Sequence, residues 1–106
     1  MSKTILDDVY RVIQSRKKIH PSESYVASLF EKGREKIAQK VGEEAVELVI
    51  EATKDNTDQL KEESADLLFH LMVLWADAGI KPEDIGEILE GRFGISGHDE
   101  KQARAS

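Results

Sequence analysis

The sequence predicts an all-α protein built from five helices. Three observations lead to this prediction. Apolar residues recur at helical spacing along the chain, no segment of useful length alternates with period two, and no internal repeat is visible. A chain of 106 residues has the size of one small domain, and no Pro-, Gly- or Ser-rich linker divides it. We therefore expect a single domain over residues 1–106, with a flexible tail from about residue 96.

The first two helices are predicted from their apolar faces. Near the N-terminus apolar residues fall at i, i+4, i+7 and i+8, which is one face of a helix. Pro21 and Ser22 are expected to open the second helix, and Gly33 marks its break or bend. The residues expected on the buried faces are Ile5, Val9, Val12 and Ile13 in the first helix, and Tyr25, Val26, Leu29 and Phe30 in the second.

Turn and cap residues set the limits of the other three helices. The third is expected from about residue 34 to residue 54, and Asn56 or Thr57 can cap the fourth after a short turn. The fourth runs to Ala78 and stops at Gly79, while Pro82 suits the first turn of the fifth. The short link at residues 55–57 allows the third and fourth helices to be antiparallel neighbours. The apolar face of the fifth helix comprises Ile85, Ile88, Leu89 and Phe93.

Composition excludes several classes of protein. The chain is 40% hydrophobic and 34% charged, which is typical of a globular protein, and it has no cysteine for disulfides or thiolate metal sites. A net charge of −6 argues against a general nucleic-acid binder. The N-terminus is too acidic for a signal peptide, and the longest apolar run, which His70 interrupts, is too short for a bilayer. We expect a cytoplasmic protein without a nucleic-acid or membrane partner.

The third helix carries carboxylates inside a largely apolar stretch, KVGEEAVELVIEA. At about 100° per residue, two apolar surfaces leave one narrow polar stripe between them, in which Glu44 and Glu47 lie one turn apart. Charged stripes of this kind are usually solvated edges held by ion pairs, so this helix alone does not predict a site. The stripe comprises Lys36, Lys40, Glu43, Glu44, Glu47 and Glu51.

The fourth helix repeats the carboxylate spacing at Glu63 and Asp66. Asp66 stands among apolar neighbours, where an unpaired carboxylate is costly to bury, and His70 follows one turn later. If the two helices are antiparallel neighbours, their carboxylate pairs face each other and repel unless a divalent cation lies between them. An all-oxygen ligand set suits Mg²⁺ or Mn²⁺. The predicted metal ligands are Glu44, Glu47, Glu63 and Asp66.

These residues resemble a known signature. Glu44-x-x-Glu47, fifteen residues, and then Glu63-x-x-Asp66 is similar to the metal motif of the MazG-like all-α nucleotide pyrophosphohydrolases. The runs SYVASLFEKGREKIAQKVGEEAVELVIEA, ADLLFHLMVLWADAGI and GRFGISGHDEKQARAS resemble one family among them, the phosphoribosyl-ATP pyrophosphatases of histidine biosynthesis. The resemblance extends from about Leu6 to Ala103. It implies Mg²⁺-dependent hydrolysis of phosphoribosyl-ATP to phosphoribosyl-AMP and pyrophosphate, and it implies a homodimer.

This reaction suggests roles for further residues. Glu43 is the candidate for orienting or deprotonating the attacking water, although an i, i+3 pair with Lys40 explains its position equally well. Lys36 and Lys40 are candidates for binding phosphate oxygens, with simple ion pairing to the neighbouring glutamates as the equal alternative. Lys32 and Arg34 beside Gly33 are weaker candidates for the same role. His70 is expected to be either a hydrogen-bond partner of a metal ligand or a satisfied core histidine, rather than a ligand itself. Arg16-Lys17-Lys18 is expected to be a solvated helix end.

Apolar residues on several sides of the third and fourth helices predict a partner subunit. Five helices of this length do not easily cover Val46 and Ile50 as well as the opposite face of the third helix. The expected assembly is a homodimer in which the third and fourth helices of both chains form a four-helix bundle. Two other functions fit the pattern less well. They are a MazG-like hydrolase of (deoxy)nucleoside triphosphates and a non-catalytic helical oligomerisation module with its acidic pairs at the surface.

Overall fold

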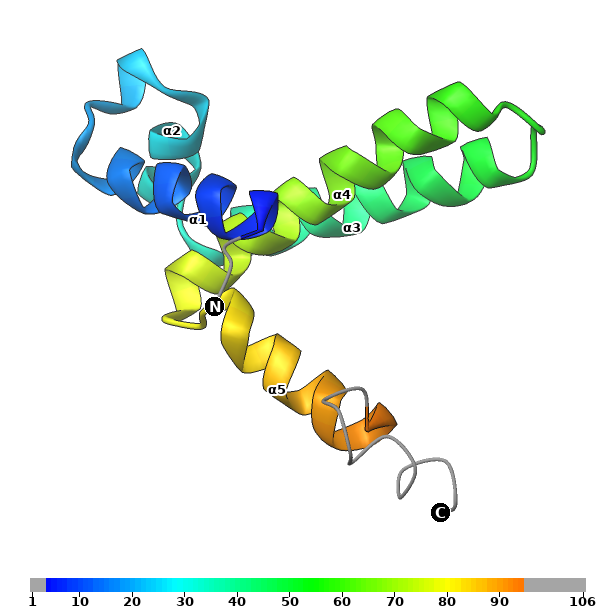
Figure 1. Ribbon diagram of the computed structural model, residues 1–106. Coiled ribbons are helices and arrows are strands. Elements are labelled where there is room, and N and C mark those ends of the chain that lie inside the picture. Colours follow the sequence, from blue (N-terminus) through cyan, green and yellow to red (C-terminus); the bar gives the residue numbers. More distant parts are fainter. Residues whose placement is uncertain (1–3, 95–106) are drawn as a thin grey trace.

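Helices account for nearly all of the chain that can be described. The computed structural model describes residues 4–94, which fold into five α-helices and two short 3-10 helices (Figure 1). This confirms the all-α prediction for these residues, whereas the tail expected from about residue 96 lies outside them. The elements are α1 (Ile5–Ser15), η1 (Arg16–Lys18), η2 (Pro21–Glu23), α2 (Tyr25–Lys32), α3 (Arg34–Ala52), α4 (Thr57–Ala78) and α5 (Pro82–Phe93).

Local sequence explains most helix ends. The side chains of Thr4, Ser24 and Asn56 accept hydrogen bonds from backbone N–H groups in the first turns of α1, α2 and α4. Gly33 separates α2 from α3 with φ +97°, and Gly79 ends α4 with φ +75°. A side chain with a Cβ rarely adopts such angles, which explains glycine at both positions. The predicted break at Gly33, cap at Asn56 and stop at Gly79 are confirmed.

The second helix begins later than the sequence suggested. Pro21–Glu23 forms a separate 3-10 turn, and α2 begins at Tyr25 because the extended Ser24 caps it. The predicted buried faces also need correction. Ile13, Val26 and Leu29 are buried as expected, but Ile5, Val12 and Tyr25 are exposed. Ile5 and Val12 lie at the margins of the α1 face, where no described element covers them.

The hydrophobic core lies where α1 and α2 pack against the start of α3 and the end of α4. Tyr10 also ties α1 to the chain after α4, because its hydroxyl donates to the Ile80 carbonyl at 2.7 Å. Arg16, Lys17 and Lys18 are exposed, as the sequence predicted. Lys17 has a further role that was not predicted, because its Nζ donates to the Ala76 carbonyl at 2.8 Å and satisfies an acceptor at the end of α4. The buried apolar cluster comprises Tyr10, Ile13, Val26, Leu29, Ile37, Met72, Val73 and Ala76.

Two parts project from this core. The α3–α4 hairpin extends to one side and α5 to another (Figure 1). The radius of gyration is 16.3 Å, against about 13 Å for a compact chain of this length. An open shape leaves apolar side chains in solvent. Val46, Val49 and Ile50 are exposed on α3, and Ile88, Leu89 and Phe93 are exposed on α5. No helix of the described part is long and apolar enough to cross a membrane.

Candidate metal centre

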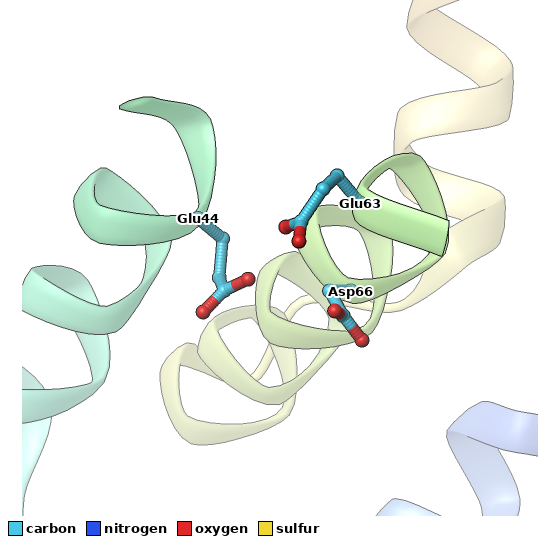
Figure 2. Close-up of side chains that lie close together, drawn as sticks. All are labelled: Glu44, Glu63 and Asp66. Atoms are coloured by element: carbon cyan, nitrogen blue, oxygen red, sulfur yellow. The ribbon is translucent and has the colours of Figure 1, made fainter. Parts of the chain in front are cut away.

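Three carboxylates meet between α3 and α4. Glu44 comes from α3, while Glu63 and Asp66 lie one turn apart on α4. One carboxylate oxygen from each residue lies within 4.8 Å of the others. Figure 2 shows Glu44 and Glu63 extending toward the space between the helices from opposite sides, with Asp66 beside Glu63. The short turn 53–56 makes this meeting possible, since it folds α4 back along α3.

Glu63 is the most unusual member of the group. Its side chain is only 7% exposed, and its Oε2 has no hydrogen-bond partner among residues 4–94. Its Oε1 accepts a long hydrogen bond from Gln59 Nε2, at 3.4 Å. Burial is the main cause that raises the pKa of Glu63 above its ordinary value of 4.5, and the negative charges of Glu47, Glu44 and Asp66 add to this. A buried, unpaired oxygen among like charges is costly for the metal-free protein.

The other two predicted ligands lie at the open side of the group. Asp66 is exposed, so the expectation that it stands in an apolar environment is wrong: its neighbours in sequence point to other sides of α4. Glu47 is also exposed and is not one of the three converging carboxylates. Nevertheless Glu47 is the nearby charge that most raises the pKa of Glu63, so it lies at the edge of the group.

Glu43 and Lys40 pair with each other on α3. Lys40 Nζ lies 3.3 Å from Glu43 Oε1, and Gln39 Nε2 donates to Glu43 Oε2 at 2.8 Å. The hydrogen bonds from Gln39 and then Lys40 lower the pKa of Glu43, and the bond to Glu43 is the main cause that raises the pKa of Lys40. The structure thus contains the ion pair that the sequence offered as an alternative. A carboxylate with a lowered pKa is a weak proton acceptor.

The remaining basic candidates occupy different places. Lys36 is half-buried one turn before Lys40, on the same stripe of α3. Lys32 is exposed in the last turn of α2. Arg34 donates from Nε to Asp77 at 2.5 Å, and it precedes Glu44 by ten residues, about 15 Å along the helix. The position of Arg34 therefore favours a structural tie between α3 and the end of α4.

His70 is buried and hydrogen-bonded, as the sequence predicted. Its Nδ1 lies 2.8 Å from the Asp66 carbonyl oxygen, and its Nε2 lies 2.9 Å from the Tyr25 hydroxyl. Gln59 contacts Glu63 of the site and Tyr25 contacts His70, yet neither was assigned a role from the sequence. Tyr25 looked like an ordinary core residue. The i, i+4 spacing of Gln59 and Glu63 was a signal that could have found the second contact.

The residues present fit a hard divalent cation. All three converging side chains offer oxygen, which suits Mg²⁺ or Mn²⁺ better than metals that prefer nitrogen or sulfur. A cation here would give the unpaired Glu63 Oε2 a partner and offset the repulsion among the carboxylates. The unpaired oxygen is independent of the family resemblance, and it supports the same kind of site.

Comparisons with known proteins bear on the chemistry of this site. Residues 6–93 match the family model described as phosphoribosyl-ATP pyrophosphohydrolase. A phosphoribosyl-ATP pyrophosphatase from Azospirillum brasilense is 55% identical over 106 residues, covering 100% of this chain and 96% of the relative. The protein of the same name from Paramagnetospirillum magneticum is 54% identical, covering 95% and 93%. Another, from Geobacter sulfurreducens, is 49% identical, covering 94% and 93%.

Proposed function

Because the chain belongs to the phosphoribosyl-ATP pyrophosphohydrolase family, we infer that it hydrolyses phosphoribosyl-ATP to phosphoribosyl-AMP and pyrophosphate. This reaction is the second step of histidine biosynthesis. The observation that carries the inference is the similarity over almost the whole chain to relatives that share one name. The acidic motif alone does not distinguish this substrate from other nucleotides, since MazG-like hydrolases of nucleoside triphosphates use a similar motif.

We further propose that Glu44, Glu63 and Asp66 hold Mg²⁺ or Mn²⁺, with Glu47 as a fourth ligand that turns inward when the site is loaded. The unpaired Oε2 of Glu63 supports this proposal. Neutralisation of the charged phosphate chain is the chemistry that the cation supplies when bound. Glu44, Glu63 and Asp66 would hold this cation between α3 and α4. Burial of Glu63 keeps one side of the site free of competing water.

Phosphate binding is proposed for the basic residues of the α3 stripe. Lys40 and Lys36 precede Glu44 by one and two turns, so their flexible stems reach oxygens beyond the carboxylate group. Lys32 and Arg34 are weaker candidates, because Arg34 already pairs with Asp77. For Glu43 we propose that it orients the attacking water as a hydrogen-bond acceptor. Its lowered pKa makes it ill suited to take the proton.

Because the reaction is biosynthetic, we propose a cytoplasmic enzyme that acts on a small molecule and has no nucleic-acid or membrane partner. We also propose that it is a homodimer. The exposed Val46, Val49 and Ile50 on α3 support the dimer, since a large apolar surface in a soluble enzyme usually meets a partner. We propose that this surface joins the α3–α4 hairpins of two chains into a four-helix bundle. Each chain, a single domain over residues 1–106, would then contribute its one α3–α4 hairpin to the bundle.

A substrate panel tests the proposed reaction. The purified protein is incubated with phosphoribosyl-ATP, ATP and the four dNTPs, with Mg²⁺ or with a chelator, and pyrophosphate release is measured. We expect release from phosphoribosyl-ATP with Mg²⁺, and little release from the other nucleotides or with the chelator. If the protein prefers dNTPs, the proposed function is wrong and the protein is a hydrolase of deoxynucleoside triphosphates. Full activity with the chelator would leave the reaction in place and remove the proposed metal.

A further inference from the structure

A hydrogen-bonded chain connects α2 to the carboxylate-bearing turn of α4. Tyr25 is the first residue of α2, and its hydroxyl lies 2.9 Å from Nε2 of His70. Nδ1 of His70 lies 2.8 Å from the carbonyl oxygen of Asp66. The two contacts span 45 and four residues of sequence, respectively. The chain therefore joins a distant helix to a residue of the candidate metal centre.

The direction of each hydrogen bond follows from the chemistry of its partners. A carbonyl oxygen only accepts, so Nδ1 of His70 carries the hydrogen and donates to Asp66. In the neutral imidazole Nε2 is then an acceptor, and the Tyr25 hydroxyl donates to it. Both nitrogens of a side chain that is only 6% exposed are thus satisfied. Loss of either partner leaves a buried polar atom unpaired.

Packing fixes the ring of His70 in this orientation. The Tyr25 ring meets it edge-on with centroids 5.8 Å apart, and the Phe69 ring does the same at 5.2 Å. The Tyr25 ring itself is half exposed, which places its hydroxyl at the boundary between the core and the site.

We propose that Tyr25 and His70 are positioning residues of the metal centre, acting through the Asp66 carbonyl. Their chain holds the turn of α4 that presents Glu63 and Asp66, at the point where the hydrophobic core ends. Hydrogen-bond partners behind metal ligands commonly alter metal affinity by 10- to 100-fold. This chain reaches the backbone of a ligand rather than its carboxylate, so its effect belongs at the lower end of that range. The inference rests on the proposed metal site.

Mn²⁺ titration of the metal-free protein by calorimetry tests this role without using activity. Tyr25→Phe removes the hydroxyl alone, and we expect it to weaken Mn²⁺ binding by about tenfold. Activity assays should show a matching rise in the Mn²⁺ concentration for half-maximal rate, with kcat restored at saturating Mn²⁺. Tyr10→Phe is the matched control. It also removes a tyrosine hydroxyl that donates a hydrogen bond, but this one lies on α1 and donates to the Ile80 carbonyl, so Mn²⁺ affinity should stay unchanged.

A second variant tests whether the two residues act as one chain. His70→Asn keeps an N–H donor near the position of Nδ1 but does not reach the Tyr25 hydroxyl. Adding Tyr25→Phe to His70→Asn should therefore weaken Mn²⁺ binding no further than His70→Asn alone. If the two substitutions weaken Mn²⁺ binding additively, Tyr25 and His70 do not act through one hydrogen-bonded chain. Imidazole ¹⁵N shifts of the wild type, assigned by comparison with His70→Asn, should report the Nδ1–H tautomer; the Nε2–H tautomer would also overturn this chain.

Failure of this inference can be told from failure of the proposed metal site. If Tyr25→Phe and Tyr10→Phe lower the melting temperature alike and both keep wild-type Mn²⁺ affinity, the Tyr25–His70 pair is structural only. In that case Glu63→Gln should still abolish Mn²⁺ binding, and the metal site stands. If the wild type does not bind Mn²⁺, or if Glu63→Gln binds it equally well, the metal site itself is wrong and the positioning role falls with it.

Discussion

The two halves of the α3–α4 hairpin differ in what they bury. At the base Ile37 and Val73 are fully buried against α1 and α2. Over residues 38–69, which form the distal half, every apolar side chain is at least partly exposed, and the buried side chain is that of Glu63. The base therefore has the composition of a protein core, whereas the distal half buries a carboxylate and leaves Val46 and Ile50 in solvent.

This difference separates the source of stability from the source of function. Apolar burial stabilises the base directly, since each fully buried side chain of this size contributes roughly 1.5–3 kcal/mol. The distal half has no such apolar burial against the described residues 4–94, and its carboxylates repel one another. On the proposed function, a cation between the helices and a partner on their outer face would supply the missing stabilisation.

The largest effect is expected at Glu63. Glu63→Gln keeps the size of the side chain but removes the charge that we propose holds the cation. Turnover should therefore fall by more than about 100-fold, beyond the loss typical of groups that only support a ligand. Glu62→Gln changes the adjacent, exposed glutamate and should keep wild-type activity. Steady-state pyrophosphate release with Mg²⁺ measures both variants. Equal losses in the two would mean that charge on α4, rather than the site, sets the rate.

The outer face of α3 should determine the oligomeric state. We expect light scattering of the wild type to give about twice the chain mass of 11.9 kDa. Ile50→Glu or Val46→Lys places an unpaired charge in the proposed interface and should weaken association by about 100-fold, or about 3 kcal/mol. Val12→Lys alters an equally exposed valine on α1 and is the control. If the wild type is an active monomer at micromolar concentration, the proposed dimer is wrong.

A smaller effect is expected from the basic residues of the stripe. Lys40→Ala and Lys36→Ala should each raise KM for phosphoribosyl-ATP by about tenfold, the value of one charged hydrogen bond to phosphate. Lys18→Ala is the appropriate control because Lys18 is exposed in η1, whereas Lys17 donates to the Ala76 carbonyl. If Lys40→Ala leaves KM unchanged, Lys40 does not bind phosphate, and its ion pair with Glu43 is its only role.

Local signals in the sequence predicted the helices well. Asn56 and Gly79 act through their own backbone and side chain, so their roles follow from residue type. The start of α2 was placed too early because Pro21 also favours a 3-10 turn, and the choice between the two depended on Ser24. The convergence of Glu44 with the α4 carboxylates followed from spacing and a short turn, and the geometry agrees with it.

Long-range contacts were beyond the reach of sequence patterns. Nothing in the sequence connects Lys17 to the Ala76 carbonyl or Tyr25 to His70, because these pairs meet only after α1 and α2 pack on α4. Exposure was also misjudged. Asp66 has apolar neighbours along the chain, yet on a helix its immediate neighbours point elsewhere, and the open side of the hairpin leaves it in solvent.

The smallest expected effect is on thermal stability, and it reverses with metal. The pKa of Glu63 is raised above 4.5 in the folded protein, so the folded state binds this proton more tightly than the unfolded state does. Proton binding to Glu63 therefore stabilises the folded state fully below pH 4.5. This stabilisation is lost as the pH rises through the raised pKa of Glu63 in the folded protein. Without metal at neutral pH, Glu63→Gln should therefore melt a few degrees above the wild type, and the gap should close as pH falls toward 4.5.

Saturating Mg²⁺ should invert this order at neutral pH, because only the wild type gains the free energy of binding the cation. Circular-dichroism melts from neutral pH down to about pH 4.5, with chelator or with Mg²⁺, measure both effects, and Glu62→Gln should follow the wild type throughout. If Glu63→Gln melts below the wild type in chelator at every pH, the buried carboxylate stabilises the distal half by itself. The proposed contrast, in which the base is stable by itself and the distal half depends on a ligand, would then be wrong, because it rests on Glu63.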